Sequence, residues 1–470
     1  MGMKRKITAD LLEWKNNPDK VGLLIKGARQ VGKTYIVDEF GREQYDYYVK
    51  LDMNIEEDRA VFSSMSAESV IRRISARNLS FRVEKGRSLI FIDEVQTCPD
   101  AILAIKYLVT ETEADIIASG SMLGIDRNPP RSYPVGYVHE IRMYPMDFEE
   151  YLWAIGMPEE ETDRIRDHVG TGTPFDPVIL RTLNGYFRQH LIVGGMPKVV
   201  ASSLDKSTYA DAVKALDTYI SGCRNDIDAY ADANIQNDVR KLFEIVPIEL
   251  SKPNKRLRYT DIDDRTNVGI REYREPVDWL EGAWIVNLCY RIRNIERPLK
   301  MHAKHSMFKM YLLDTGVLIR MLGQGAMEAI SDDDISINEG AIAENAVCSM
   351  LSKCGITPFY YEIAKEVEID FVAEFGRDLC AIEVKSGKNR KARSLKKLME
   401  MDQGRKITRW IKFEYGNIMR TDDGVEHYPL FAASFANSMI PPTAAVPRMY
   451  GRRASAAGYQ TQRSGLRGTL

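Results

Sequence analysis

The segment from Gly27 to Thr34 has residue types and a spacing that suit a loop for binding phosphate groups. It reads G-A-R-Q-V-G-K-T, which matches G-x-x-x-x-G-K-T, and it lies between an apolar run and a helix-like stretch. Its glycines let backbone N–H groups curl around phosphate oxygens, Lys33 would meet the charge of the β- and γ-phosphates, and Thr34 would offer its hydroxyl to Mg²⁺. The expected loop residues are Gly27, Ala28, Arg29, Gln30, Val31, Gly32, Lys33 and Thr34. A chance glycine-rich turn is the alternative, which the flanking elements disfavour.

Two adjacent carboxylates follow a second apolar run, Leu89–Ile92. In this arrangement Asp93 would hold Mg²⁺ and Glu94 would activate an attacking water, so hydrolysis is expected as well as binding. The run Tyr47–Asp52 lies between the two motifs in the sequence, and we therefore expect an extra strand between them in the sheet. Ser119 ends the next strand and is a candidate sensor of the γ-phosphate, with a plain turn residue as an equal alternative.

A further set of candidate catalytic residues lies near the C-terminal end. In residues 366–372 charged and apolar side chains alternate, so a strand would place Glu368 and Asp370 on one face. The run that follows repeats this alternation with Glu383 and Lys385, and a glycine-containing turn between the runs predicts a hairpin.

Carboxylates that converge with a lysine suit a metal-dependent phosphodiesterase site. Asp370 and Glu383 would hold Mg²⁺ or Mn²⁺, and Lys385 would orient water or help to deprotonate it. Glu344, on the preceding helix, is a candidate third metal ligand. A surface hairpin that alternates charged and apolar residues, with no catalytic role, is the alternative interpretation.

Short β-branched runs and helical stretches alternate along the first third of the chain, which predicts a parallel α/β sheet. The expected strands are Val21–Lys26, Tyr47–Asp52, Ser88–Ile92, Asp115–Ala118 and Val138–Met143. Residues 155–185 form a charged connector with several glycines and prolines and no sustained apolar period, which indicates a boundary or lid. Beyond it, helix, polar strand, Asp-rich turn, helix and strand follow in the order of a winged helix-turn-helix.

The predicted organisation has five parts. They are a P-loop ATPase domain (1–155), a helical connector (156–235), a winged-helix-like module (236–300), a nuclease-like α/β domain (301–435) and a disordered basic tail (436–470). The fold class is therefore α/β, with a winged-helix middle.

Several of these segments together resemble the AAA-type ATPases of prokaryotes that carry a C-terminal domain of long-unassigned function. The matching segments are Gly27–Thr34, Phe91–Gln96, Ala118–Ser121, Tyr144–Leu152, Tyr311–Gly316, Asn338–Asn345 and Ala381–Gly387. The resemblance implies an ATPase core, a winged-helix middle and a restriction-endonuclease-like end with a PD-(D/E)xK core. Many relatives have Gly-Arg where this chain has Gly136-Tyr137, so the arginine finger is unassigned, with Arg127 and Arg131 as nearby candidates.

Composition limits the classes of function only loosely. The chain has 470 residues, 44% of them hydrophobic and 28% charged, and no apolar run is long enough to span a bilayer. The six cysteines form no C-x-x-C pair and there is no secretory signal, so we expect buried thiols in a cytoplasmic protein. The net charge of −2 gives no overall attraction to nucleic acid, although a local basic face is compatible with it.

Two hypotheses about function follow. The first is an ATP-binding and ATP-hydrolysing AAA-type protein that acts with or on nucleic acid, where the C-terminal domain binds or cleaves it. The second is an ATP-dependent regulator whose nuclease-like domain binds a partner without cutting. Expected cofactors are ATP and Mg²⁺, with Mn²⁺ at the C-terminal site. DNA and further copies of the chain are candidate partners. On the predicted recognition helix, Arg271 and Arg274 would favour DNA binding, while acidic residues such as Glu272 oppose it. A DNA-reading module and a packing module are therefore equal alternatives there.

Overall fold

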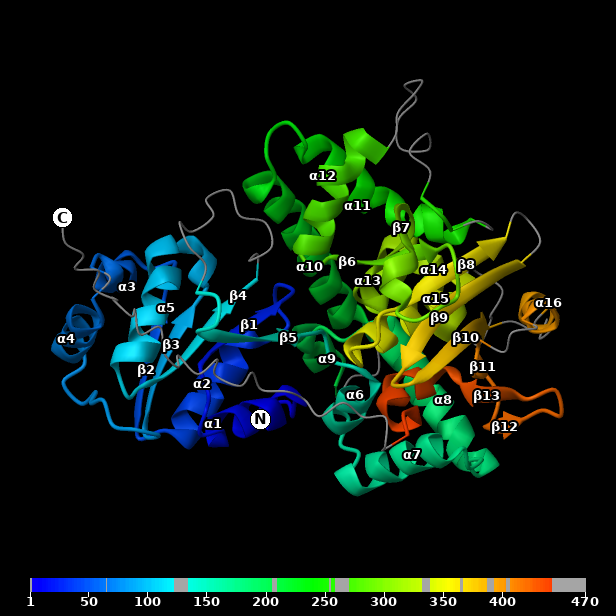
Figure 1. Cartoon of the computed structure of the whole chain (residues 1–470), viewed down its shortest axis with the longest axis horizontal. Coiled ribbons are helices and arrows are strands. Elements are labelled where there is room, and N and C mark those ends of the chain that lie inside the picture. Colours follow the sequence, from blue (N-terminus) through cyan, green and yellow to red (C-terminus); the bar gives the residue numbers. More distant parts are fainter. Residues whose placement is uncertain are drawn as a thin grey trace, which may run out of the picture.

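The computed structural model places two β-sheets beside one another, with helices between and around them (Figure 1). It describes residues 2–64, 66–121, 134–204, 209–252, 255–257, 270–331, 339–363, 367–386, 393–402 and 406–441. The arginine-finger candidates Arg127 and Arg131 and most of the predicted basic tail lie outside these residues.

The first sheet is parallel throughout, as predicted. Its strands are β1 (Gly22–Gly27), β2 (Tyr47–Asp52), β3 (Ser88–Asp93), β4 (Asp115–Gly120) and β5 (Val138–Met143), in the order β2-β3-β4-β1-β5. One strand does separate β1 from β3, but it is β4. Strand β2, which precedes β3 in the sequence, lies at the edge, because the chain crosses to the far side of the sheet after β1 and returns through β3 to β4, which fills the gap beside β1.

Alternating side chains bury both faces of this sheet. Leu23 and Ile25 of β1 point into one hydrophobic cluster, and Leu24 points into another on the opposite face. The helices that cover the faces are α1 (Ile7–Asn16), α2 (Lys33–Gln44), α3 (Glu56–Arg59), α4 (Ala67–Arg77) and α5 (Pro99–Glu111), with short 3₁₀ turns η1 (Ala60–Phe62) and η2 (Val95–Thr97).

A helical region follows the first sheet. Its helices are α6 (Phe148–Ala154), α7 (Glu159–Thr171), α8 (Pro177–Val193), α9 (Pro197–Ser203), α10 (Ala210–Tyr230), α11 (Gln236–Ser251) and α12 (Ile270–Gly282). The charged segment expected as a boundary or lid is thus largely helical. Ile165 and Val169 of α7 are buried in the main hydrophobic cluster, and α7 packs against the 3₁₀ segment η5 (Leu430–Met439). These two apolar positions and the buried Thr162 form one face of the helix, and most of its other residues are exposed.

The second sheet has eight strands in the order β12-β13-β11-β10-β9-β8-β6-β7. They are β6 (Val286–Ile292), β7 (Ala303–Leu312), β8 (Phe359–Ile363), β9 (Val367–Phe375), β10 (Asp378–Lys385), β11 (Arg409–Glu414), β12 (Met419–Arg420) and β13 (Val425–Pro429). Its helices are η4 (Leu299–His302), α13 (Thr315–Leu322), α14 (Gln324–Ser331), α15 (Glu339–Lys353) and α16 (Arg393–Met401). Strands β9 and β10 pair antiparallel around Gly376, whose φ is +63°, so the predicted hairpin is present.

This sheet crosses the expected domain boundary at residue 300. Strand β6 pairs with β7 on one side and with β8 on the other, so residues from both sides of that boundary share one sheet. In the described part of the polar strand predicted before the Asp-rich turn, one isolated β-bridge joins Arg256 to Lys309. Residues 258–269 lie outside the described chain. The winged-helix interpretation therefore stays a prediction.

The tail begins later than residue 436. Phe435, Ala436 and Met439 are buried in the main cluster, because η5 fills the space between α7 and α15. Over the described residues, no helix is long and apolar enough to cross a membrane.

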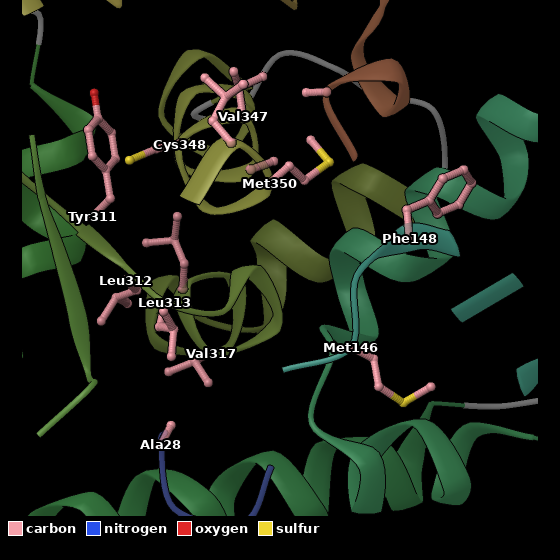
Figure 2. Packing of buried hydrophobic residues seen from close by; sticks show 14 of the residues in the cluster. Ala28, Met146, Phe148, Tyr311, Leu312, Leu313, Val317, Val347, Cys348 and Met350 are labelled. Carbon is pink, nitrogen blue, oxygen red and sulfur yellow. The ribbon is translucent and has the colours of Figure 1, made fainter. Parts of the chain in front are cut away.

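One hydrophobic cluster extends from the first sheet to the second. Ala28 of the phosphate loop, Val317 of α13 and Val347 of α15 all belong to it (Figure 2). This cluster therefore connects the phosphate loop to the C-terminal half of the chain.

Candidate nucleotide site and C-terminal carboxylate cluster

The loop at the end of β1 has the backbone shape that phosphate binding requires. A Cβ on Gly27 would lie 2.1 Å from the carbonyl oxygen of Met143, so only glycine fits beside β5. Gly32 has a φ of +95° and Gln30 a φ of +63°, which turn the loop sharply before α2 begins at Lys33. The N-terminus of α2 therefore points its free N–H groups into the loop.

Lys33 lies at the centre of this loop. Its Nζ donates to the carbonyl oxygens of Gly27 (3.0 Å) and Ala28 (2.9 Å), and the side chain is buried. Burial lowers the pKa of Lys33 to about 8, against the opposing effect of Glu94 and Asp93. A phosphate that enters the loop would replace the two carbonyls as the partner of this ammonium.

Asp93, at the end of β3, accepts hydrogen bonds from two hydroxyls, those of Thr34, expected at the same Mg²⁺, and of Ser119, expected at the γ-phosphate. Its Oδ1 accepts hydrogen bonds from Thr34 Oγ1 (3.1 Å) and from Ser119 Oγ, and its Oδ2 pairs with Lys50 Nζ (3.2 Å). A buried carboxylate next to a hydroxyl offers the oxygen ligands that Mg²⁺ prefers. The residues thus fit the ion that the motif implies, and Ser119 contacts Asp93 directly.

Glu94 has an unusual backbone for a residue other than glycine, with a φ of +50°. Its Oε2 accepts hydrogen bonds from Gln96 and from Ser121 Oγ (3.2 Å). Such left-handed conformations cost on the order of 1–3 kcal/mol and concentrate at functional sites. Here the turn places a second carboxylate beside Asp93, where it can orient a water.

Arg5 holds the phosphate loop in place through its side chain, a role that the sequence did not indicate. It is buried and donates to the carbonyl oxygens of Val31 and Tyr144 (both 2.7 Å), while its Nε pairs with Glu150 (3.1 Å). Glu150 in turn belongs to a capping box with Asp147 at the start of α6. The D-x-x-E spacing was a signal for that cap, but nothing in the sequence indicated its arginine partner.

The C-terminal carboxylates do come together, on three elements. Glu344 lies on α15, Asp370 on β9 and Glu383 on β10, and all three side chains are buried. Burial, and then the charges of Glu344 and Glu383, raise the pKa of Asp370 to about 8. Burial also raises the pKa of Glu383. The main-chain N–H of Val384 donates to Asp370 (2.8 Å).

Lysines neutralise this cluster. Lys385 pairs with Glu383 and Lys255 pairs with Glu344, which also accepts a hydrogen bond from Tyr311. Burial alone would raise the pKa of Glu344, but Lys255 and Lys309 outweigh it and hold that pKa below its usual range.

Lys309 of β7 is the central cation of the cluster, and the sequence analysis missed it. Its side chain is 1% exposed, and its Nζ lies 2.8 Å from Glu368, 3.9 Å from Glu344 and 5.2 Å from the ring centre of Tyr360. Burial opposes its charge, but Glu344 and Glu368 raise its pKa above the usual range. Across the described residues, no group of three or more His, Cys, Asp or Glu is arranged to hold a metal ion, so the predicted Mn²⁺ site at Glu344, Asp370 and Glu383 is not supported.

A parallel sheet with this loop after β1, a helix that begins at the loop lysine and an aspartate at the end of β3 defines a P-loop nucleotide-binding domain. Residues 20–152 match the family described as AAA domain. Residues 184–328 match Domain of unknown function (DUF8612), and residues 339–430 match Domain of unknown function (DUF4143). No curated protein matches the chain in sequence.

Solved structures that match this chain include the following three. The Walker-type ATPase PABY2304 of Pyrococcus abyssi is 13% identical over 68% of this chain and 96% of its own, with a TM-score of 0.42. The Aeropyrum pernix Orc1 protein in complex with DNA is 12% identical over 70% and 91%, with a TM-score of 0.29. Cdc6p from Pyrobaculum aerophilum is 12% identical over 70% and 93%, with a TM-score of 0.23.

Proposed function

We propose that this chain binds ATP with Mg²⁺ at the phosphate loop and hydrolyses it. The observation that carries the proposal is the meeting of Thr34 and Ser119 at Asp93, with the Glu94 carboxylate held in the adjacent turn. Mg²⁺, when bound, neutralises phosphate charge. Thr34 and Asp93 would hold the ion, Lys33 would meet the β- and γ-phosphates, and Glu94 would accept a proton from the attacking water.

ATP binding should weaken as pH rises above about 8. The ammonium of Lys33 is the form that meets phosphate, and the pKa of that group in the free protein is about 8. Above that pH each further unit should lower the apparent ATP affinity about tenfold, until the higher pKa of the bound state is reached. Equilibrium binding of a fluorescent ATP analogue between pH 7 and 10 measures this.

Two variants make the pH result specific to Lys33. Lys33→Ala should bind ATP weakly at every pH with no inflection near 8. Lys26→Ala, on strand β1 just before the loop and paired with Glu140 (2.7 Å), should behave like the unmodified chain. An inflection that persists in Lys33→Ala would contradict the assignment.

For the C-terminal half we propose a domain that binds a partner and does not cut nucleic acid. The observation that favours this function is the set of lysines that pair with Glu344, Glu368 and Glu383. Ammonium groups already supply the positive charge that a metal would bring. We expect no Mn²⁺-dependent rise in the melting temperature of the full chain and no cleavage of plasmid or single-stranded DNA. A rise in melting temperature that disappears in Asp370→Asn, together with DNA cleavage, would favour the nuclease hypothesis.

Lys309→Met should destabilise the folded chain by about 3–5 kcal/mol, because it leaves buried carboxylates without their central cation. Urea denaturation followed by far-UV circular dichroism measures the change. Lys304→Met, on the same strand but partly exposed, is the matched control and should change stability by less than about 1 kcal/mol. Equal effects of the two substitutions would show that Lys309 does not neutralise the cluster.

A further inference from the structure

Arg29 stands at the tip of the phosphate loop and faces helix α10. Its guanidinium forms an ion pair with Asp226, which is 8% exposed, whereas the Arg29 side chain is 51% exposed. The two residues border an open groove between the loop and α10. The groove is also lined by Gln30, Thr218, Ser221 and Asn225.

Two other cationic side chains near the loop, those of Arg5 and Lys50, already have partners within the protein. Arg5 is buried and bound to Glu150 and to two carbonyl oxygens, and Lys50 pairs with Asp93. Arg29 has a single carboxylate partner, on a different element, and half of its side chain is in solvent. Its charge also contributes to the low pKa of Lys33, so the guanidinium lies within electrostatic reach of the lysine that meets the phosphates.

We propose that Arg29 is a catalytic residue supplied by the loop itself, which leaves Asp226 and binds the γ-phosphate when ATP is present. The proposal rests on ATP hydrolysis as the proposed function. In that reaction the water oxygen bonds to the γ-phosphorus and its proton passes to Glu94. The bond from the γ-phosphorus to the bridging oxygen breaks, and its electron pair leaves with ADP. Arg29 would stabilise the charge that develops on the equatorial and bridging oxygens.

Asp226 gives this arrangement its selectivity for the triphosphate. An ATP molecule brings a γ-phosphate that competes with the carboxylate for the guanidinium, which forms charge-assisted hydrogen bonds with either group. ADP lacks the group, so the ion pair would re-form after the phosphate leaves. The pair thus distinguishes the two nucleotides.

The experiment compares three substitutions in the full chain with three readouts. The readouts are the affinity for a non-hydrolysable ATP analogue, the affinity for ADP and the turnover of ATP. Arg29→Gln should weaken analogue binding by about tenfold or more. ADP affinity should change less than about twofold, and turnover should fall by about a thousandfold. Asp226→Asn should strengthen analogue binding about threefold or more and leave ADP affinity unchanged.

Arg224→Gln is the matched control, because Arg224 lies two residues from Asp226 on α10 but pairs with Glu244 (2.7 Å). It should change none of the three readouts. In the double variant Arg29→Gln, Asp226→Asn, the analogue affinity should equal that of Arg29→Gln alone, since the carboxylate no longer has a guanidinium to hold.

The outcomes separate this inference from the proposed function. If Arg29→Gln retains turnover and analogue affinity within about threefold of the unmodified chain, the role of Arg29 is overturned while hydrolysis stands. If the unmodified chain binds but does not hydrolyse ATP, the proposed function fails, and a catalytic Arg29 fails with it. If Asp226→Asn lowers analogue affinity, the competition between carboxylate and phosphate is overturned.

Discussion

Glu94→Gln should abolish ATP turnover and leave ATP binding intact. The carboxylate is the group that can accept a proton from the attacking water, and the isosteric amide cannot. General-base removal of this kind slows a reaction by about 10²–10⁴-fold. The amide would retain the size of the side chain and an oxygen for the hydrogen bond from Ser121, which lies 3.2 Å from Glu94 Oε2. Single-turnover kinetics and equilibrium binding on the same preparation measure the two effects separately.

Glu113→Gln is the control for this substitution, because Glu113 is an exposed carboxylate just before β4. It should leave both readouts unchanged. Turnover in Glu94→Gln that equals the rate of the unmodified chain would remove Glu94 as the base, and loss of ATP binding in that variant would show a structural defect instead.

A fragment that begins at residue 300 should fail to fold. It would contain β7 and β8 but lack β6, the strand that lies between them. Cys289 and Ile292 of β6 are fully buried, so their removal would open the core and expose the edges of both neighbours. Far-UV circular dichroism and urea titration should show no cooperative transition for this fragment.

A fragment that begins at residue 209 is the control. It retains β6 together with α10, α11 and α12, and should keep a cooperative transition, although it loses contacts with the first sheet and with α6 to α9, among them those of α7 with η5 and of α8 with α13. Cooperative unfolding of both fragments would show that β6 is dispensable to the second sheet.

The local parts of the fold were the predictable ones. Each strand of the first sheet is a short apolar or β-branched run with turn residues at its ends. The hairpin of β9 and β10 is indicated by two runs of alternating charged and apolar residues on either side of a glycine. The order of the strands within the sheet could not be predicted from the sequence. Whether β2 or β4 lies next to β1 depends on how the chain crosses the sheet, and the sequence between the strands does not specify this.

That the candidate nucleotide-site residues lie together was predictable, because they are close in sequence or follow buried strands. The partners of these residues were not. Lys309 looks like an ordinary polar position in an alternating strand, and only the pairing of β7 with β6 places it among the carboxylates. Arg5 lies far in sequence from Glu150. A single sequence does not reveal ion pairs of this kind, because each partner alone resembles a solvated charge.

Helix α10 carries a carboxylate toward each half of the molecule. Asp226 pairs with Arg29 of the phosphate loop, and Asp217 forms a two-pronged ion pair with Arg320 of α13 (2.7 and 3.0 Å). The two carboxylates are about 14 Å apart along one helix, so a displacement of α10 would act on both ion pairs. Thermodynamic linkage then makes the coupling reciprocal. A partner that binds at α13 and is coupled to the loop would change the affinity for ATP by the same factor by which ATP changes the affinity for that partner. Nucleotide titration would then also serve as an assay for the proposed partner.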